Sequence, residues 1–394
     1  MIKRESTAVL KRMAATFPVV SITGPRQSGK TTLVQNVFPE KEYISLEDPI
    51  ERDLAITDPK KFFSRFPNGA IIDEVQRIPD LFSYIQIIVD ERKVMGDFIL
   101  TGSNQFEYMR SLSQSLAGRT AILKLLPFSY QEIFSDKKED INKILFKGMF
   151  PAIYDRNLDV DIYFRSYINT YLERDVRQLI NIVEISKFQR FLELCAGWTG
   201  RILNKSSIAS AVGISQPTVE NWLSVLEASF IIYRLRPFYK NLKKRLTKSS
   251  KLYFFDTGLI CKLLRIENFK QLLTHPLQGE IFENFVVSEF LKYRLHKGLD
   301  SNLYYFRDSH GNEVDIIIET GYGSVPIEIK SGQTINFSFF KGLDIFGKLE
   351  HGYKSSGLIY GGERNYQYKD YQIRDYTKVY EMYEELTKDE NWNV

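Results

Sequence analysis

The sequence predicts an α/β protein whose first part is a parallel sheet with helices on both faces. Three observations support this fold class. A glycine-rich loop occupies residues 24–31, strand-like apolar runs alternate with helix-like segments up to about residue 135, and 394 residues are too many for one hydrophobic core. The chain therefore has room for two or three domains.

The first elements follow from the spacing of apolar residues. Residues 2–16 carry apolar side chains at helical spacing, and residues 17–23 form an apolar run typical of a buried strand. Residues 81–89 suit a helix. The other strand-like runs are 43–46, 70–74, 98–104 and 121–126. Because ligands of such sheets lie beyond the carboxyl ends of the strands, polar residues at those ends are functional candidates.

The glycine-rich loop has the form G-x-x-x-x-G-K-T and lies between a predicted strand and a predicted helix, which disfavours a chance match in an ordinary turn. Its backbone N–H groups and the helix N-terminus suit a polyphosphate. We expect ATP here, with Lys30 on the outer phosphates and the Thr31 hydroxyl on Mg²⁺. The expected nucleotide contacts are Gly24, Pro25, Arg26, Gln27, Ser28, Gly29, Lys30, Thr31 and Thr32.

Two later strands end in polar residues at the same predicted edge of the sheet. Asp73 is placed to hold the Mg²⁺ shell, and Glu74 can act as the general base that polarises the attacking water. From the neighbouring strand, Ser103 or Asn104 can contact the γ-phosphate or that water; we take Asn104 as the catalytic residue. A solvated strand end is the alternative for the acidic pair.

Phosphoryl transfer also needs a positive side chain to neutralise charge that develops on the phosphate. Arg119 is one candidate, acting in its own subunit or across a subunit interface, and Arg26 inside the loop is another. The alternative for Arg119 is a helix cap or an ion pair with a surface acid.

The segments GPRQSGKT, AIIDEVQ, ILTGSN, LAGRT and LPFSYQEI, in this order, resemble a group of prokaryotic AAA-type ATPases that carry a C-terminal domain of unknown function. The resemblance covers nearly the whole chain. It implies an ATPase sheet over residues 1–135 with the catalytic glutamate beside the metal aspartate, and it favours an arginine finger. It implies no substrate.

The middle of the chain is expected to be helical. Residues 136–190 suit the helical lid that follows the nucleotide domain in AAA-type proteins. Within 191–262, two helix-like segments flank Gly213; Ser215 can cap the second, and Pro217 is tolerated in its first turn. We therefore expect a winged-helix domain whose second helix can enter a DNA major groove, with packing or protein binding as the alternative.

The wing of this domain is expected to carry positive charge. Between residues 234 and 251 there is no acidic residue and Lys or Arg occurs eight times, which suits contacts to DNA phosphates. The eight are Arg234, Arg236, Lys240, Lys243, Lys244, Arg245, Lys248 and Lys251.

Residues 263–394 are expected to form a nuclease-like α/β domain. Glu328 and Lys330 alternate on one strand and share a face, and Asp315 lies on the adjacent strand. This set resembles the PD-(D/E)xK nuclease fold, with Glu283 on the preceding helix and Glu280 as the second choice. Asp315 and Glu328 are the expected metal ligands. The alternative is an ordinary ion pair on a surface strand, or an inactive relative of the nucleases.

The composition fits a soluble globular protein with 43% hydrophobic and 26% charged residues. Two cysteines suggest neither a disulfide framework nor a zinc site, and no signal peptide or membrane segment is evident, so we expect a cytoplasmic protein. The net charge of +4 is too small to indicate nucleic acid by itself. We expect an ATPase coupled to DNA binding and metal-dependent cleavage, or else a nucleotide-switched module that binds a protein partner. A homo-oligomer fits either function.

Overall fold

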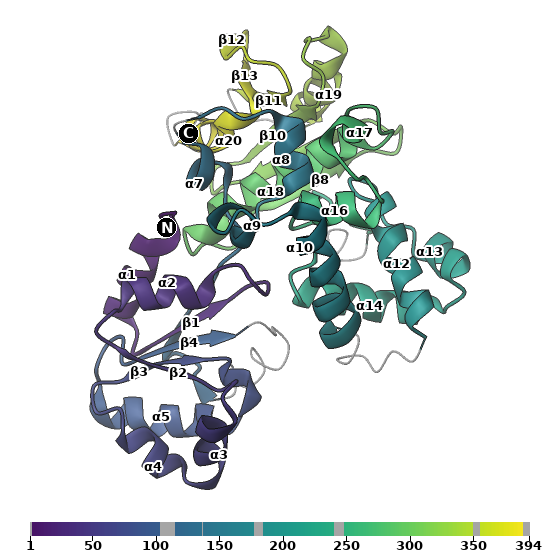
Figure 1. Cartoon of the computed structure of the whole chain (residues 1–394). Coiled ribbons are helices and arrows are strands. Elements are labelled where there is room, and N and C mark those ends of the chain that lie inside the picture. Colours follow the sequence, from purple (N-terminus) through teal and green to yellow (C-terminus); the bar gives the residue numbers. More distant parts are fainter. Residues whose placement is uncertain are drawn as a thin grey trace.

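The computed structural model describes residues 2–102, 115–135, 137–176, 184–239, 248–349 and 355–388. Figure 1 shows three connected regions along the chain: an N-terminal sheet at the lower left, a helical region at the lower right, and a second sheet at the top.

The N-terminal sheet contains five parallel strands in the order β2-β3-β4-β1-β5. All side chains of β1, β3 and β4 are buried, as expected for central strands covered on both faces. The predicted strands are confirmed, with ends that differ by up to two residues from the prediction. The bounds are Val19–Thr23 (β1), Glu42–Ser45 (β2), Ala70–Asp73 (β3), Phe98–Gly102 (β4) and Thr120–Lys124 (β5).

Helices cover both faces of this sheet and make two separate cores. On one face α1 and α2 pack on β1 through residues such as Leu10 and Val34. On the other face α4 and α5 contribute Phe62 and Phe82. The bounds are Ser6–Thr16 (α1), Lys30–Val37 (α2), Pro49–Thr57 (α3), Pro59–Ser64 (α4), Val75–Arg77 (η1) and Leu81–Arg92 (α5).

The middle of the chain is largely helical, and its helix–glycine–helix prediction is confirmed as local structure. Gly213 has a left-handed φ of 75° between α13 and α14, and the Ser215 hydroxyl accepts a hydrogen bond from the Thr218 amide. An antiparallel pair of strands, β6 and β7, follows. The bounds are Tyr130–Phe134 (α7), Ile141–Lys147 (α8), Pro151–Asp155 (α9), Val160–Tyr167 (α10), Ile168–Val176 (the π-helix η2), Ile185–Gly197 (α12), Lys205–Val212 (α13), Gln216–Ala228 (α14), Ile232–Leu235 (β6), Lys251–Phe254 (β7), Thr257–Leu263 (α16) and Phe269–Leu273 (α17).

The C-terminal region has a mixed six-stranded sheet in the order β12-β13-β11-β10-β9-β8. A long helix, α18, precedes three antiparallel strands, and β11 then joins β10 in parallel after α19. The bounds are Gln278–His296 (α18), Leu303–Arg307 (β8), Glu313–Glu319 (β9), Ser324–Lys330 (β10), Phe337–Phe340 (η3), Lys341–Leu349 (α19), Ser356–Tyr360 (β11), Tyr366–Tyr368 (β12), Tyr371–Asp375 (β13), Tyr376–Lys378 (η4) and Val379–Thr387 (α20).

One continuous hydrophobic core joins the middle and C-terminal regions. It includes residues from Leu126 to Leu386 and draws on the helices after the first sheet, on α12–α14 and on α18. The predicted boundaries at 190/191 and 262/263 therefore fall inside one packed unit. This unit begins at Leu126, before the predicted boundary at 135/136, and the cores of the first sheet end at Leu125. Within the described part of the chain, no helix combines the length and the apolar character needed to cross a membrane.

Candidate functional site: a nucleotide cleft and a distant carboxylate cluster

The glycine-rich loop connects the carboxyl end of β1 to the start of α2. Gly24 has φ 153°, and a Cβ placed there would lie 2.1 Å from the Leu125 carbonyl oxygen. Gly29 has φ 88° and immediately precedes α2. Both positions therefore require glycine, one for space and backbone conformation and the other for conformation. The loop places the first backbone N–H groups of α2 at the end of the sheet, where an anion is stabilised.

Lys30 lies under this loop. Its ammonium donates to the carbonyl oxygens of Gly24 at 3.1 Å and Pro25 at 2.8 Å, and the residue is 6% exposed. Burial lowers the pKa of Lys30 to about 8, although Glu74 and Asp73 act in the opposite direction. The lysine is thus directed at the space that the loop encloses, with two carboxylates close enough to influence its charge.

Asp73 accepts hydrogen bonds from three hydroxyl groups at the edge of the sheet. The Thr31 hydroxyl donates to it at 3.0 Å and the Tyr43 hydroxyl at 2.7 Å, and Thr101 of β4 also donates to it. The structure therefore brings Thr31 and Asp73 together, as a shared Mg²⁺ shell requires. Oxygen atoms from a hydroxyl and a carboxylate fit that hard cation. Sequence reasoning missed Tyr43 and Thr101, although Thr101 lies near the carboxyl end of its strand.

Glu74 follows β3 directly. Its backbone is left-handed, with φ 55° and ψ 40°, a conformation that costs free energy for a residue with a side chain. Gln76 donates a hydrogen bond to its carboxylate. Glu74 lines the same cleft as Lys30 and Thr31, which is the position expected for a base that acts on water near the phosphates.

This cleft has a volume of about 700 Å³ and lies between the loop and the first helices of the lid. The sheet side contributes Arg26 and Glu74. The other side contributes Pro151 of α9, and Arg156 and Asp159 of the connection between α9 and α10. Arg156 is exposed, so its positive charge faces a wet space beside the phosphate loop. Sequence reasoning missed it because nothing local marks an arginine on a lid.

A smaller hollow of about 220 Å³ adjoins the cleft and shares Gly29, Thr32 and Pro151 with it. Its other walls include the apolar side chains of Ile2, Leu33, Val37 and Phe128. A polar cleft next to an apolar hollow suits a ligand with a charged end and a flat apolar end.

The two arginines predicted to neutralise charge on the phosphate, Arg26 and Arg119, lie in different parts of the structure. The Arg26 guanidinium lies over the Tyr171 ring, 5.4 Å from its centroid, so the loop contacts η2. Arg119 precedes β5 at the amino edge of the sheet and pairs with Asp90 at 2.6 Å. Arg119 is therefore not beside the loop of its own chain, and its role across a subunit interface stays a prediction. Ser103 and Asn104 lie outside the described residues.

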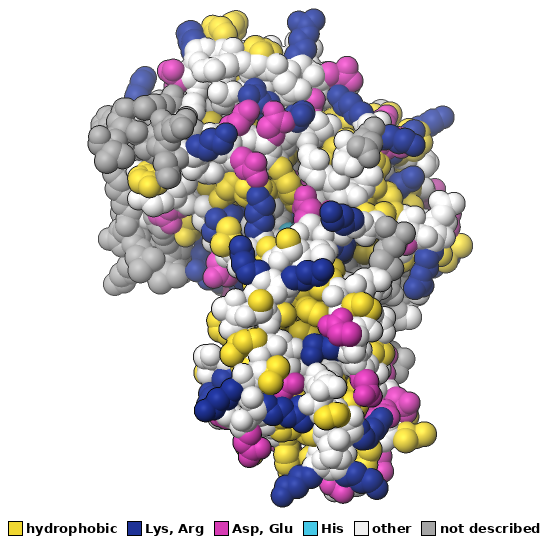
Figure 2. All heavy atoms as spheres, turned by 90° about the vertical axis from the view of Figure 1, so that its left-hand side faces the viewer, with side chains coloured by type: hydrophobic (Ala, Val, Ile, Leu, Met, Phe, Trp, Pro, Cys, Tyr) yellow, Lys and Arg dark blue, Asp and Glu magenta, His cyan; other side chains and the backbone are white. Residues whose placement is uncertain are grey.

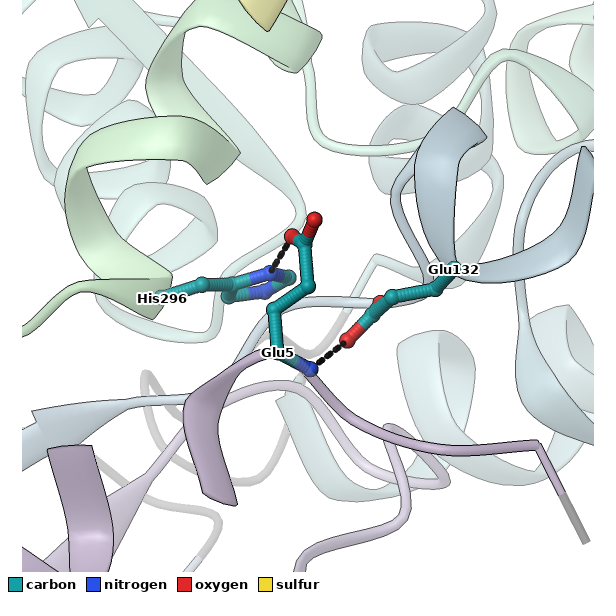
Figure 3. A group of neighbouring side chains, drawn as sticks. All are labelled: Glu5, Glu132 and His296. Carbon is teal, nitrogen blue, oxygen red and sulfur yellow. Dashed lines mark hydrogen bonds and ion pairs between the residues drawn. The ribbon is translucent and has the colours of Figure 1, made fainter. Parts of the chain in front are cut away.

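Arg4 joins the phosphate loop to the segment that leaves the sheet. Its buried guanidinium donates to the Ser28 carbonyl at 2.8 Å, to the Leu126 carbonyl at 2.7 Å and to the Glu132 carboxylate at 2.9 Å. Figure 3 shows Glu132 accepting the Glu5 amide, at 2.8 Å, and the Glu5 side chain directed at the His296 ring of α18. The N-terminus thus connects the phosphate loop with the C-terminal unit.

In the C-terminal sheet, the structure brings together the four predicted residues. Lys330 contacts the Glu328 carboxylate at 2.5 Å and Asp315 at 3.6 Å, and Asp315 also accepts the Ile329 amide at 2.9 Å. Glu283 faces this group from α18. The second choice, Glu280, instead pairs with Arg201. Metal binding by Asp315 and Glu328 stays a prediction.

A fifth residue, Lys251 of β7, also enters the cluster. Its ammonium lies 3.0 Å from Glu283, 2.5 Å from Glu313 and 3.5 Å from Asp315. Burial raises the pKa of Glu283 to about 7, although Lys251 opposes this, and burial with Asp315 raises the pKa of Glu328 to about 8. Sequence reasoning placed Lys251 on a basic wing instead.

Two of the eight basic residues predicted to contact DNA are therefore paired with acidic residues of the same chain. Besides Lys251, Arg234 pairs with Glu220 and with Glu227, each at 2.6 Å. Arg236 and Lys248 are exposed, and Lys240, Lys243, Lys244 and Arg245 lie outside the described residues. On the face in Figure 2, Lys and Arg side chains are interspersed with Asp and Glu.

In comparisons with known protein families, three family models match successive parts of the chain. An AAA domain matches residues 16–134, a domain of unknown function (DUF8612) matches 138–270, and another (DUF4143) matches 278–380. The second match spans the predicted lid and winged helix as one unit, in agreement with their shared core.

Two uncharacterized proteins, of Mycobacterium tuberculosis and Mycobacterium bovis, are each 31% identical over 342 residues, covering 85% of this chain and 75% of theirs. A Walker-type ATPase of Pyrococcus abyssi aligns with a TM-score of 0.46 and 15% identity over 66% of this chain and 95% of its own, which adds nothing to the assignment. With its phosphate loop, its parallel sheet and these matches, the chain belongs to the family of AAA-type ATPases that carry C-terminal domains of unknown function.

Proposed function

We propose that the protein binds ATP in the cleft between the phosphate loop and the lid and hydrolyses it to ADP and phosphate. The observation that carries this proposal is the contact between Thr31 and Asp73 beside the loop that encloses Lys30. Thr31 and Asp73 would hold Mg²⁺, whose charge offsets that of the phosphates.

Each remaining role follows from position. The loop amides and Lys30 hold the β- and γ-phosphates. Glu74 accepts a proton from water as the water oxygen attacks the γ-phosphorus, and the bond from phosphorus to the β-phosphate oxygen breaks. Arg156 faces the phosphates from the lid and stabilises negative charge on them. The apolar hollow that shares Gly29 with the cleft accommodates the base.

The test compares nucleotide binding and phosphate release for the full chain with Mg²⁺. Lys30→Ala and Asp73→Asn should both reduce turnover by roughly a hundredfold or more, since the first removes a positive charge at the phosphates and the second weakens the binding of Mg²⁺. Lys61→Ala, at a solvated position on α4, is the matched control and should behave as wild type. ATP turnover that persists in both site variants would show that another site, or a contaminant, hydrolyses ATP.

We propose secondly that the α13–α14 pair contacts DNA. The helix–turn–helix followed by a β6–β7 hairpin is the arrangement of a winged helix, and Gln216 and Asn221 of α14 are exposed polar residues that suit base edges. Because Arg234 and Lys251 are paired within the chain, only the other basic residues of the wing are available for DNA phosphates.

This second proposal is tested by duplex binding at several salt concentrations. Asn221→Ala should weaken binding, and joint neutralisation of Lys243, Lys244 and Arg245 should reduce the salt dependence by up to about three phosphate contacts. An unchanged salt slope would remove the wing from the interface, and no binding at low salt would favour a protein partner.

A further inference from the structure

The carboxylate cluster of the C-terminal sheet contains the ammonium groups of two lysines, which differ in their exposure to solvent. The Lys251 side chain is 2% exposed, whereas that of Lys330 is 33% exposed. Asp315 lies between them: its Oδ1 faces Lys251 at 3.5 Å and its Oδ2 faces Lys330 at 3.6 Å. The cluster therefore has an inner cation position at Lys251 and an outer one at Lys330.

Lys251 occupies the inner position, where its ammonium donates a hydrogen bond to Glu283 at 3.0 Å and forms ion pairs with Glu313 and Asp315. An ammonium group has three N–H donors, and three carboxylates, those of Glu283, Glu313 and Asp315, surround this one. Two of these acids come from one strand, because Glu313 and Asp315 alternate on β9 and share a face. Glu283 arrives from α18.

The backbone of Lys251 is equally constrained. It pairs with Leu235 in the β6–β7 ladder and forms a bridge with Ile202 on its other side. Two residues further on, Tyr253 points to the same face and donates to Glu283 at 2.5 Å. The backbone of Lys251 is therefore held in a strand that is paired on both edges, which keeps its side chain directed at the face that Tyr253 shares.

A divalent cation does not fit the inner position while Lys251 is there. A metal ion would need the same carboxylate oxygens at about 2.0–2.6 Å. An ammonium group held by those oxygens fills that space and repels a second cation. The outer position is different, since one oxygen of Glu328 is buried without a hydrogen-bond partner and Lys330 is partly exposed. Asp315 and Glu328 supply carboxylate oxygens of the kind that a hard divalent cation binds, so a cation can bind there when Lys330 turns toward solvent.

We propose that the ammonium of Lys251 permanently replaces a metal ion at the inner position, so that the cluster accepts at most one divalent cation, at Asp315 and Glu328. The cluster then cannot support a mechanism that requires two divalent cations. The inference is independent of ATP hydrolysis, because the cluster and the nucleotide cleft share no lining residue.

The test is Mn²⁺ binding to the full chain without nucleotide, measured by electron paramagnetic resonance and by thermal denaturation. Lys251→Met keeps the apolar stem and removes the charge, and it should gain about one bound Mn²⁺ relative to wild type, with Mn²⁺ raising its melting temperature. The double variant Lys251→Met with Glu283→Gln should lose this gain. Lys292→Met, which removes another buried lysine paired with Glu289, is the matched control and should gain none.

Two further results would overturn the proposal. One is Mn²⁺ binding by the wild-type chain that Glu283→Gln abolishes, since the inner position would then already bind metal. The other is a change in the acetylation of Lys251 by acetic anhydride, which mass spectrometry measures on the wild-type chain. Lys251 should stay unreactive with and without Mn²⁺; a rise on adding Mn²⁺ would mean that metal displaces it. This second measurement decides the matter even if Lys251→Met fails to fold.

Discussion

Replacing Arg4 by Met should loosen the phosphate loop, because Arg4 holds this loop although it is not one of the expected phosphate contacts. The guanidinium makes two hydrogen bonds to carbonyl oxygens and one ion pair with Glu132, and it stacks 4.8 Å from the centre of the Phe128 ring. Methionine retains apolar contact with that ring but removes every polar contact. The side chain of Glu132 is fully buried, so its charge loses its partner where water cannot replace it.

The size of the effect follows from these contacts. Removing one partner of a buried pair costs about 3–5 kcal/mol. The lower end applies here because Glu132 keeps hydrogen bonds from the amides of Glu5, at 2.8 Å, and Ser129, at 2.9 Å. We therefore expect about 3 kcal/mol, which corresponds to roughly a hundredfold increase in local opening.

Hydrogen exchange with mass spectrometry measures this opening in peptides that contain residues 24–31 and 126–132. Both should exchange faster by roughly a hundredfold in Arg4→Met. Arg12→Met, on the exposed face of α1, the helix that follows Arg4, is the control and should shift local stability by less than about 0.5 kcal/mol. An acceleration below roughly threefold in Arg4→Met would show that the stability of the loop does not depend on the contacts of Arg4.

Three other predictions concern charge around the phosphates. Since the pKa of Lys30 is lowered to about 8, the free protein loses this positive charge as pH rises through that value; ATP binding should then weaken and take up a proton at pH 9 but not at pH 7, which calorimetry in buffers of different ionisation heat detects. Equal proton uptake at both pH values would contradict this. Arg156→Ala should weaken ATP binding by about tenfold in a fluorescence titration, while an unchanged affinity would remove Arg156 from the phosphate contacts. Arg119→Ala should leave ATP binding by the dilute chain unchanged, because Arg119 lies at the opposite edge of the sheet; a concentration-dependent loss of turnover would assign it to a neighbouring subunit's site.

The strands of the first sheet could be predicted because their burial on both faces leaves continuous apolar runs, as in β3 and β4. Helices α3 and α4 were missed for the opposite reason: they lie on the surface, and Ile50 and Ile56 of α3 are exposed, which blurs the helical pattern. Their start signals were present, since Asp48 and Asp58 each precede a proline and cap a helix through the side chain.

The candidate site divides in the same way. Residues that belong to one local motif, such as Lys30, could be predicted from spacing. Arg4 and Arg156 could not, because the chain brings them to the loop only through packing that spacing does not encode. The prediction for Lys251 was wrong because it rested on neighbouring residues alone. Its place among other basic residues suggested an exposed wing, but the alternation of side chains along β7 places Lys251 and Tyr253 on the same buried face.

The central claim is that this chain hydrolyses ATP with Glu74 as the base. Replacement of Glu74 by Gln keeps the size of the side chain and removes its ability to accept a proton. We predict that Glu74→Gln binds ATP with near wild-type affinity but turns it over more slowly by roughly a hundredfold or more in a single-turnover assay. Turnover within about twofold of wild type would contradict the assignment of Glu74 and, with it, the mechanism proposed for the cleft.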